Sequence, residues 1–262
     1  MLIEYPTSSF RQAMNLSPRE LVAFVGGGGK TTALQCLAKE LYASKKKVAL
    51  TTTTKMLLKQ LYFQGGCIIS GDYIEIEEKV SSRNGSIPLI ALIKEQMSQE
   101  KICGLPPEWV DRLWNLDKVD YLVVEADGSR GKSLKAPANH EPQIPGEATL
   151  VVPVVGLDIL NKRLTAEFVH RPELVSLLCD AAQGSVIITG TISKIIVHPL
   201  GLKKGVPAGA RFIPLINKVD VAEDWSVART LAIEIFKSDK DIERVILASF
   251  IQNSFSVIRR SN

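Results

Sequence analysis

Four consecutive glycines followed by a lysine and two threonines are the part of this chain best suited to chemistry. The residues are Gly26, Gly27, Gly28, Gly29, Lys30, Thr31 and Thr32. Glycines let the backbone turn inward and direct its N–H groups at phosphate oxygens, and a helix that starts here adds unpaired N–H groups and a positive dipole end. Lys30 would reach the β and γ phosphates of a nucleotide, and Thr31 would bind Mg²⁺ through its hydroxyl. The segment predicts a phosphate-binding loop; a flexible glycine turn without a ligand is the alternative.

The loop is shorter than the common G-x-x-x-x-G-K-[ST] pattern, because Phe24 occupies the position of the first glycine. The resulting G-x-x-G-K-T-T spacing resembles that of the Mur ligases, which use ATP. A dinucleotide-binding loop matches less well. Thr31 stands where the third glycine of G-x-G-x-x-G belongs, and the next strand ends in threonines instead of an acidic residue.

Two carboxylates, Glu125 and Asp127, come directly after an apolar run that predicts a buried strand. Strand alternation directs both to one side. In P-loop proteins an acidic group here holds Mg²⁺, directly or through water, and helps to orient the attacking water; either residue could serve. An Asp-Gly turn after an edge strand is the alternative.

A basic loop follows, with Arg130, Lys132 and Lys135 among glycines and serines. Cations there could neutralise charge on a transferring phosphoryl group, or simply lie in solvent. The expected catalytic residues are therefore Lys30, Glu125, Asp127 and Arg130, and the expected Mg²⁺ ligands are Thr31, Glu125 and Asp127.

An N-K-x-D motif made of Asn217, Lys218 and Asp220 follows another apolar run. In GTPases this motif recognises guanine: the aspartate accepts two hydrogen bonds from the ring edge, a pattern that adenine cannot offer. The lysine stem packs on the base, and the asparagine ties the loops together. A later strand ends in Ala248 and Ser249, which resembles the backbone loop that contacts the guanine oxygen. The motif favours GTP over ATP; an ordinary helix-capping aspartate is the alternative.

Alternating strands and helices position these motifs. Apolar runs predict strands at 21–25, 47–50, 67–69, 88–93, 121–124, 149–155, 212–216 and 244–247, of which 244–247 is the last clear one. Helices are predicted at 1–19, 30–42, 55–64, 172–179, 189–198 and 224–236. Another helix is expected to begin near 105–108. This order indicates βαβ units in a P-loop NTPase-like three-layer α/β fold with a mostly parallel sheet. We expect a single domain over residues 1–262, with 65–116 as a candidate insertion or lid.

The composition is that of an ordinary globular protein, with 45% hydrophobic and 23% charged residues and a net charge of +4. No basic stripe with aromatic residues indicates nucleic acid, no apolar run is long enough to span a membrane, and the first residues do not resemble a signal peptide. The four cysteines form no Cys-x-x-Cys pair, and the three histidines have no metal-binding spacing. We expect a cytoplasmic protein with reduced thiols.

Taken together, the motifs resemble the selenium-dependent hydroxylase accessory family known as YqeC. The residues that carry the resemblance are 25–32, 125–131, 134–137, 140–142, 155–158, 170–173, 198–199, 201–202 and 217–220, of which the block 125–142 is the most specific. The resemblance implies a role in maturing molybdenum hydroxylases that carry labile selenium, with such a hydroxylase or its cofactor assembly proteins as partners. It says little about the reaction.

Three functions are compatible with these residues. The first is a Mg²⁺-dependent NTPase, with GTP favoured over ATP, that assists metallocofactor insertion by switching loops held by the γ-phosphate. The second is an ATP-dependent ligase or kinase that acts on a small cofactor precursor, which the short loop spacing favours. The third is a nucleotide sensor that does not hydrolyse its ligand and acts by binding a partner.

Overall fold

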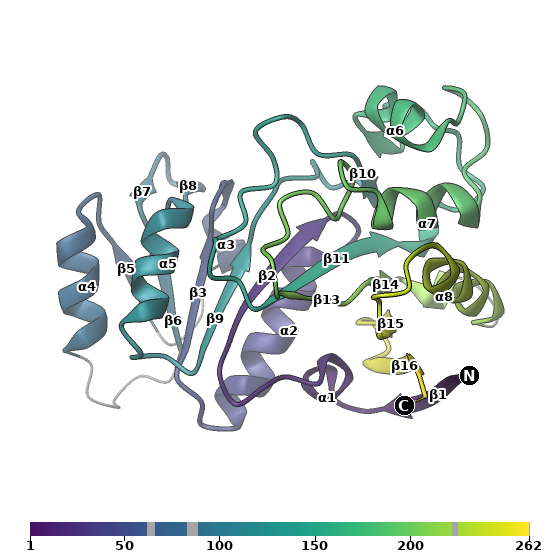
Figure 1. Ribbon diagram of the computed structural model, residues 1–262. Helices are drawn as coiled ribbons and strands as arrows, with labels where there is room; N and C mark the ends of the chain where they lie inside the picture. Colours follow the sequence, from purple (N-terminus) through teal and green to yellow (C-terminus); the bar gives the residue numbers. More distant parts are fainter. Residues whose placement is uncertain (62–65, 83–88, 222–224, 262) are drawn as a thin grey trace.

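A wide sheet runs through the centre of the computed structural model (Figure 1), which describes residues 1–61, 66–82, 89–221 and 225–261. The strands follow the order β1-β16-β15-β14-β11-β2-β9-β3-β6-β5, and β13 pairs with β11. Their bounds are β1 Leu2–Thr7, β16 Ser254–Arg260, β15 Arg244–Ser249, β14 Leu215–Asn217, β11 Leu150–Gly156, β2 Glu20–Gly26, β9 Tyr121–Glu125, β3 Val48–Thr52, β6 Leu89–Ile93, β5 Cys67–Ile69 and β13 Arg211–Phe212.

Neighbouring strands are parallel from β5 to β15, and at one edge β16 is antiparallel to both of its neighbours, β15 and β1. Every residue of β2, β9 and β11 is buried. Strands covered on both faces need apolar side chains at successive positions, which is why these segments are continuous apolar runs. The α/β class with a mostly parallel sheet is therefore confirmed.

Helices cover both faces of the sheet, so the fold has three layers (Figure 1). Along β2, Val22 and Phe24 pack with one core and Leu21, Ala23 and Val25 with another. Helices α1 (Phe10–Met14) and α2 (Lys30–Ala43) cover the first face. The opposite face is covered by α4 (Tyr73–Ser81), α5 (Pro107–Asn115), α7 (Thr189–Val197) and α8 (Ser226–Ser238).

Smaller elements surround this frame. A two-stranded parallel pair joins β10 (Leu134–Lys135) to β12 (Val169–His170), and α6 (Pro172–Cys179) follows and contacts α7. A small antiparallel sheet contains β4 (Lys55–Leu57), β8 (Lys101–Cys103) and β7 (Glu95–Gln96), next to α3 (Leu58–Leu61). Two 3₁₀ turns, η1 (Leu157–Ile159) and η2 (Val219–Val221), follow β11 and β14.

Several local predictions were wrong. The expected helix over 1–19 is strand β1 followed by the short helix α1, because residues 2–7 pair with β16 at the other end of the chain. The strand expected at 244–247 is not the last one, because β16 follows it and pairs with it and with β1. Residues 55–57 form a strand instead of starting a helix, since they pair with β8. Some predicted positions lie outside the described residues: 62–64 of the helix expected at 55–64, 88 of the strand expected at 88–93, and 224 of the helix expected at 224–236.

The stretch 65–116 is partly integral to the sheet. Strands β5 and β6 extend it beyond β3, and α4 and α5 cover its face. Among the described residues of this stretch, strands β7 and β8 lie outside the main sheet and form a small sheet with β4, in which β8 is the central strand. No helix in the described part of the chain is both long and apolar enough to cross a membrane.

Candidate functional site

The predicted motifs meet at the carboxyl edge of the parallel sheet. Strand β2 ends at Gly26, β9 at Glu125, β11 at Gly156, β14 at Asn217 and β15 at Ser249. The register aligns these ends: Gly26 lies beside Val154, Phe24 beside Glu125, Gly156 beside Asn217 and Asn217 beside Ala248. Ligands of open α/β sheets bind at this edge.

The glycine loop turns the chain sharply from β2 into α2. Gly26, Gly28 and Gly29 have φ angles of 92°, 78° and 126°, which favour glycine. Helix α2 begins at Lys30, and its N-cap Gly29 has no side chain to cap it. The first amides of a helix have no carbonyl one turn earlier to bind. Gly29 and Thr31 are half-buried and Thr32 is exposed, so this helix start borders solvent.

The first part of the loop differs from the expected open cradle. The amide of Gly26 donates to both carboxylate oxygens of Asp127 at 3.1 and 3.0 Å. The amides of Gly27 and Gly28 donate to the carbonyls of Val154 and Lys132 at 2.8 and 3.0 Å. The loop lies against β11 and Asp127 on one side, and the segment 129–133 folds over Gly27 and Gly28 on the other. In this conformation the phosphate donors still directed outward are those at the start of α2.

Lys30, Glu125 and Asp127 are brought together as predicted. The Lys30 ammonium donates to the carbonyl of Gly26 at 2.6 Å and lies 3.2 Å from Asp127 Oδ1 and 3.8 Å from Glu125 Oε1. Thr31 Oγ1 donates to Glu125 Oε2 at 2.8 Å. Burial raises the pKa of Glu125, against the lowering effects of Lys30 and of the Thr31 hydrogen bond.

The oxygen pair of Thr31 and Glu125 fits a Mg²⁺ ion that also binds phosphate. Mg²⁺ prefers hard oxygen ligands and is commonly bound by one or two protein groups together with substrate phosphates. No group of three or more acidic, histidine or cysteine side chains in the described residues could hold a metal alone. Asp127 is turned away from this pair, toward Gly26 and Lys135.

Lys135 is not the loop cation that the sequence suggested. It is fully buried, and its ammonium contacts Asp127 Oδ2 at 2.9 Å, Glu141 Oε2 at 2.6 Å and the Gly128 carbonyl at 2.7 Å. Arg171 donates to both oxygens of Glu141 at 2.7 and 3.2 Å. These two cations hold the pKa of Glu141 at about 2, although burial alone would raise it.

Arg130 is exposed at the tip of the loop after β9, with a φ of 52°. Lys132 points away from the phosphate loop, toward the carbonyl of Glu167. Arg130 is thus the only one of the three predicted loop cations placed in solvent, where it could reach a bound phosphate if the loop moved.

The N-K-x-D residues lie beside the phosphate loop. Asn217 is buried, and its amide donates to the carbonyl of Gly28 at 2.7 Å, so it ties the two loops together as expected. The side-chain oxygen of Asn217 is buried with no hydrogen-bond partner among the described residues. Lys218, at a φ of 61°, instead donates to Asp158 at 2.7 Å and Ser133 at 2.8 Å.

The other base-recognition residues are less clearly placed. Asp220 is half-buried in η2. Ala248 and Ser249 are fully buried in β15, and Ser249 Oγ accepts a hydrogen bond from the amide of Gln252 at 3.2 Å. Any contact of these two with a base would therefore go through the backbone or need the loop to move.

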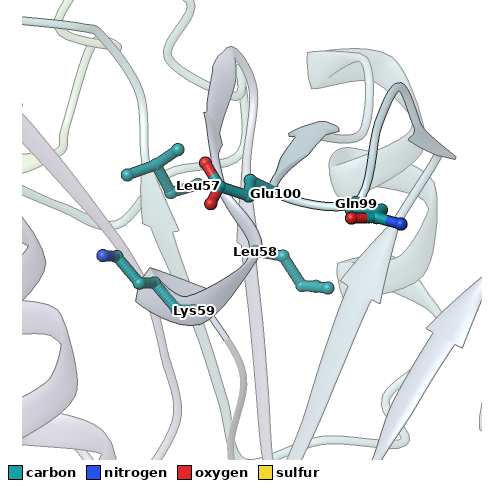
Figure 2. Close-up of a pocket in the computed structure, with 5 residues that line it drawn as sticks. All are labelled: Leu57, Leu58, Lys59, Gln99 and Glu100. Atoms are coloured by element: carbon teal, nitrogen blue, oxygen red, sulfur yellow. The ribbon is translucent and has the colours of Figure 1, made fainter.

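The described surface has hollows at two places relevant to the site. One, of about 360 Å³, lies by β4 and α3 and contains none of the predicted site residues (Figure 2); its lining is Leu57, Leu58, Lys59, Gln99 and Glu100. The other, of about 440 Å³, lies between η1 and η2, next to the N-K-x-D motif, and is lined by Leu157, Asp158, Leu160, Asn161, Lys162, Val221 and Val227.

The sequence motifs did not assign a role to three residues of the site: Glu141, Arg171 and Asp158. Each lies in a segment that carried the family resemblance, namely 140–142, 170–173 and 155–158, so the signal was present without an assigned role. Their partners are 6 to 60 positions away in the sequence, which a motif does not reveal.

Comparisons with known proteins identify the family of the chain. The model of the family described as YqeC protein matches residues 22–173. The protein YqeC of Escherichia coli (strain K12) is 30% identical over 240 residues, which cover 92% of this chain and 91% of that protein. The crystal structure of the signal recognition particle receptor FtsY from Elizabethkingia anophelis aligns with a TM-score of 0.38 and 12% identity, over 87% of this chain and 58% of that one.

Proposed function

This chain belongs to the YqeC family, and we propose that it is a Mg²⁺-dependent nucleoside-triphosphate-binding protein that hydrolyses GTP in preference to ATP. The observation that carries the proposal is one cluster at the sheet edge. An uncapped helix start, the Lys30 ammonium and the Thr31–Glu125 oxygen pair all lie at the turn from β2 to α2. Anions bind at such helix starts because amides and dipole act together.

Phosphate binding would use the start of α2 and would draw the Lys30 ammonium away from Asp127. The segment 129–133 now covers the glycines, with Lys132 accepting from Gly28. This segment also carries Arg130 at its tip. We infer that a nucleotide displaces 129–133, which frees loop amides and moves Arg130 toward the phosphates. An arginine in that position would stabilise charge as phosphoryl transfer proceeds.

Mg²⁺ would be held by Thr31 and Glu125 together with phosphate oxygens. When bound, the ion would neutralise charge on the phosphates and orient them. Glu125 is buried next to Lys30, and its hydrogen bond from Thr31 keeps the carboxylate directed at the hydroxyl. Asp127 is committed to Gly26 and Lys135, so Glu125 is the better metal ligand of the two.

Guanine preference is proposed from Asp220, with Asn217 fixing the distance between motif and phosphate loop. The hollow between η1 and η2 lies beside this motif, and its volume is in the range of small-molecule sites. We expect Asp220→Asn to weaken GTP binding by roughly 10- to 150-fold, equivalent to the ~1.5–3 kcal/mol of a hydrogen bond to a charged group. ATP binding should change little. Equal effects on both nucleotides in calorimetric titrations would remove the base-recognition role.

The biological role is proposed as assistance to the maturation of selenium-dependent molybdenum hydroxylases, in the cytoplasm. Its support is the family membership together with the block 125–142, whose residues build the charge network of the site. The partner would be such a hydroxylase or a protein that assembles its cofactor. Nucleotide hydrolysis would switch the segment 129–133 between two positions and so release or admit the partner.

The test is phosphate release from GTP and ATP, each with Mg²⁺. Lys30→Ala should abolish turnover, whereas Lys39→Ala, an exposed lysine on the same helix, should leave it unchanged. Equal rates for the wild-type protein and Lys30→Ala would reject the proposal.

One observation favours a second candidate, a nucleotide sensor without turnover. The segment 129–133 covers the phosphate loop. Arg130, which that segment carries, is exposed to solvent and does not lie on the loop. A sensor would bind Mg²⁺-nucleotide tightly and release no phosphate, even after long incubation. Turnover by the isolated protein would exclude this candidate.

Phosphate release only after a cofactor precursor is added would instead support the ligase or kinase alternative.

A further inference from the structure

A line of charged groups that alternate in sign runs from the phosphate loop to β12. Its members, in order of contact, are Glu125, Lys30, Asp127, Lys135, Glu141 and Arg171, and the successive nitrogen–oxygen distances are 3.8, 3.2, 2.9, 2.6 and 2.7 Å. With all six groups ionised, the line is neutral. The sequence suggested roles in nucleotide chemistry for the first three and, as a loop cation, for Lys135, but none for Glu141 or Arg171.

Asp127 occupies the middle of this line. Its side chain is 1% exposed and contacts both the Lys30 and the Lys135 ammonium groups. It also accepts the Gly26 amide at the point where β2 enters the loop. A buried carboxylate that loses its cation is strongly unfavourable. If Lys135 were absent, Asp127 would depend on Lys30 alone.

Nucleotide binding as proposed above requires Lys30 to serve the phosphates. We propose that Lys135 is a positioning residue, which holds the Asp127 side chain in place and bonded to Gly26 while Lys30 turns from Asp127 to the nucleotide. This inference rests on the proposed function. It assigns to Lys135 an indirect role: it contacts neither phosphate nor metal and acts only through Asp127.

The surroundings of Lys135 suit this role. It lies on β10, which pairs with β12, and it also donates to the Gly128 carbonyl. Glu141 offsets the charge of Lys135 on the far side, and Arg171 offsets that of Glu141. Lys135 is therefore fixed from three directions and cannot follow Lys30. A lysine held this way supplies a constant positive charge to Asp127 in both states of the loop.

The experiment measures the dissociation constants of Mg²⁺-GTP and Mg²⁺-ATP by calorimetry for five proteins. They are the wild type, Lys135→Met, Asp127→Asn, the double variant with both changes, and Lys203→Met as a matched control. Lys203 forms an ion pair with Asp239 at 2.6 Å outside the site. Thermal melts establish the folded fraction of each protein.

We expect Lys135→Met and Asp127→Asn each to weaken binding by at least about tenfold, because each breaks a buried charge pair. The double variant should bind within about twofold of Asp127→Asn, since Lys135 has no role once the Asp127 charge is gone. Lys203→Met should bind like the wild type.

Two results would overturn the inference. One is wild-type affinity in Lys135→Met. The other is a double variant that shows the summed losses of both single variants, which would mean that Lys135 acts independently of Asp127. If Lys135→Met does not fold, the comparison of Asp127→Asn with the double variant decides alone, because removing both charges leaves no unpaired ion. If the wild-type protein itself does not bind nucleotide, the proposed function is refuted. That result comes from the wild-type titration alone, so it is distinguished from a failure of the inference about Lys135.

Discussion

Replacing Thr31 with valine tests the metal site most selectively. Valine has nearly the same shape but lacks the hydroxyl that donates to Glu125 Oε2 at 2.8 Å. The change should remove one Mg²⁺ ligand and the hydrogen bond that orients the carboxylate. A hydrogen bond to a charged group contributes ~1.5–3 kcal/mol. We therefore expect the tightening of GTP binding by Mg²⁺ to shrink by roughly 10- to 150-fold, while binding without Mg²⁺ changes little.

The assay is a titration of each protein with GTP in the presence of Mg²⁺ and again in EDTA. Thr31→Ser keeps the hydroxyl and should retain most of the Mg²⁺ effect. Thr230→Val makes the same chemical change at an exposed residue of α8, outside the phosphate loop, and should behave like the wild type. A Thr31→Val protein that keeps the full Mg²⁺ effect would show that Thr31 and Glu125 do not hold the ion.

Three further outcomes are expected. Gly28→Ala should destabilise the fold by more than about 2 kcal/mol, because a Cβ atom at its φ of 78° would lie 2.2 Å from the Gly156 nitrogen. Gly131 has a similar φ of 75° but open space around it, so Gly131→Ala should show a smaller loss of stability in denaturant unfolding. Equal losses for the two variants would contradict the packing around Gly28. Asn217→Ala should cost roughly 1–3 kcal/mol in the same assay, because the buried Gly28 carbonyl loses its donor; an unchanged midpoint would contradict this. Burial and nearby cations lower the pKa of His170 to about 4 from 6.5, so its contribution to stability should be complete above pH ~6.5 and be lost as the pH falls toward 4. Unfolding free energies measured across this range should fall less steeply for His170→Gln; an identical slope would count against a buried neutral imidazole.

Local patterns predicted the centre of the fold well. Strand β2, the glycine loop and α2 are adjacent in sequence, and their residue types decide their structure: a fully buried strand, glycines at positive φ and an apolar helix face. The same holds for β9, β11 and α7. For these elements, burial on both faces or on one face produces a periodicity that can be recognised without the rest of the chain.

The elements that failed depend on distant partners. Residues 2–7 are a strand because residues 254–260 lie beside them, and residues 55–57 are a strand because of 101–103. The chemistry of the site has the same origin. Gly26 bonds to Asp127, 101 positions later, and Gly28 to Lys132. The motifs could locate the loop, but they could not show that a neighbouring segment covers it.

The role of Lys135 could not be predicted for a related reason. In sequence it belongs to a run of glycines, serines and basic residues, which suggests a solvated loop. In the structure it is fully buried between two carboxylates. Burial of a lysine is favourable only when acidic partners surround it. The partners here, Asp127 and Glu141, come from the segments that follow β9 and β10.

The most direct test of the central claim is a crystal structure with a non-hydrolysable GTP analogue and Mg²⁺. We expect the phosphates at the start of α2, with the Lys30 ammonium on them, the metal on Thr31 and Glu125, and residues 129–133 displaced from Gly28. Phosphates bound elsewhere, with Gly28 still bonded to Lys132 and Lys30 still on Asp127, would contradict the claim.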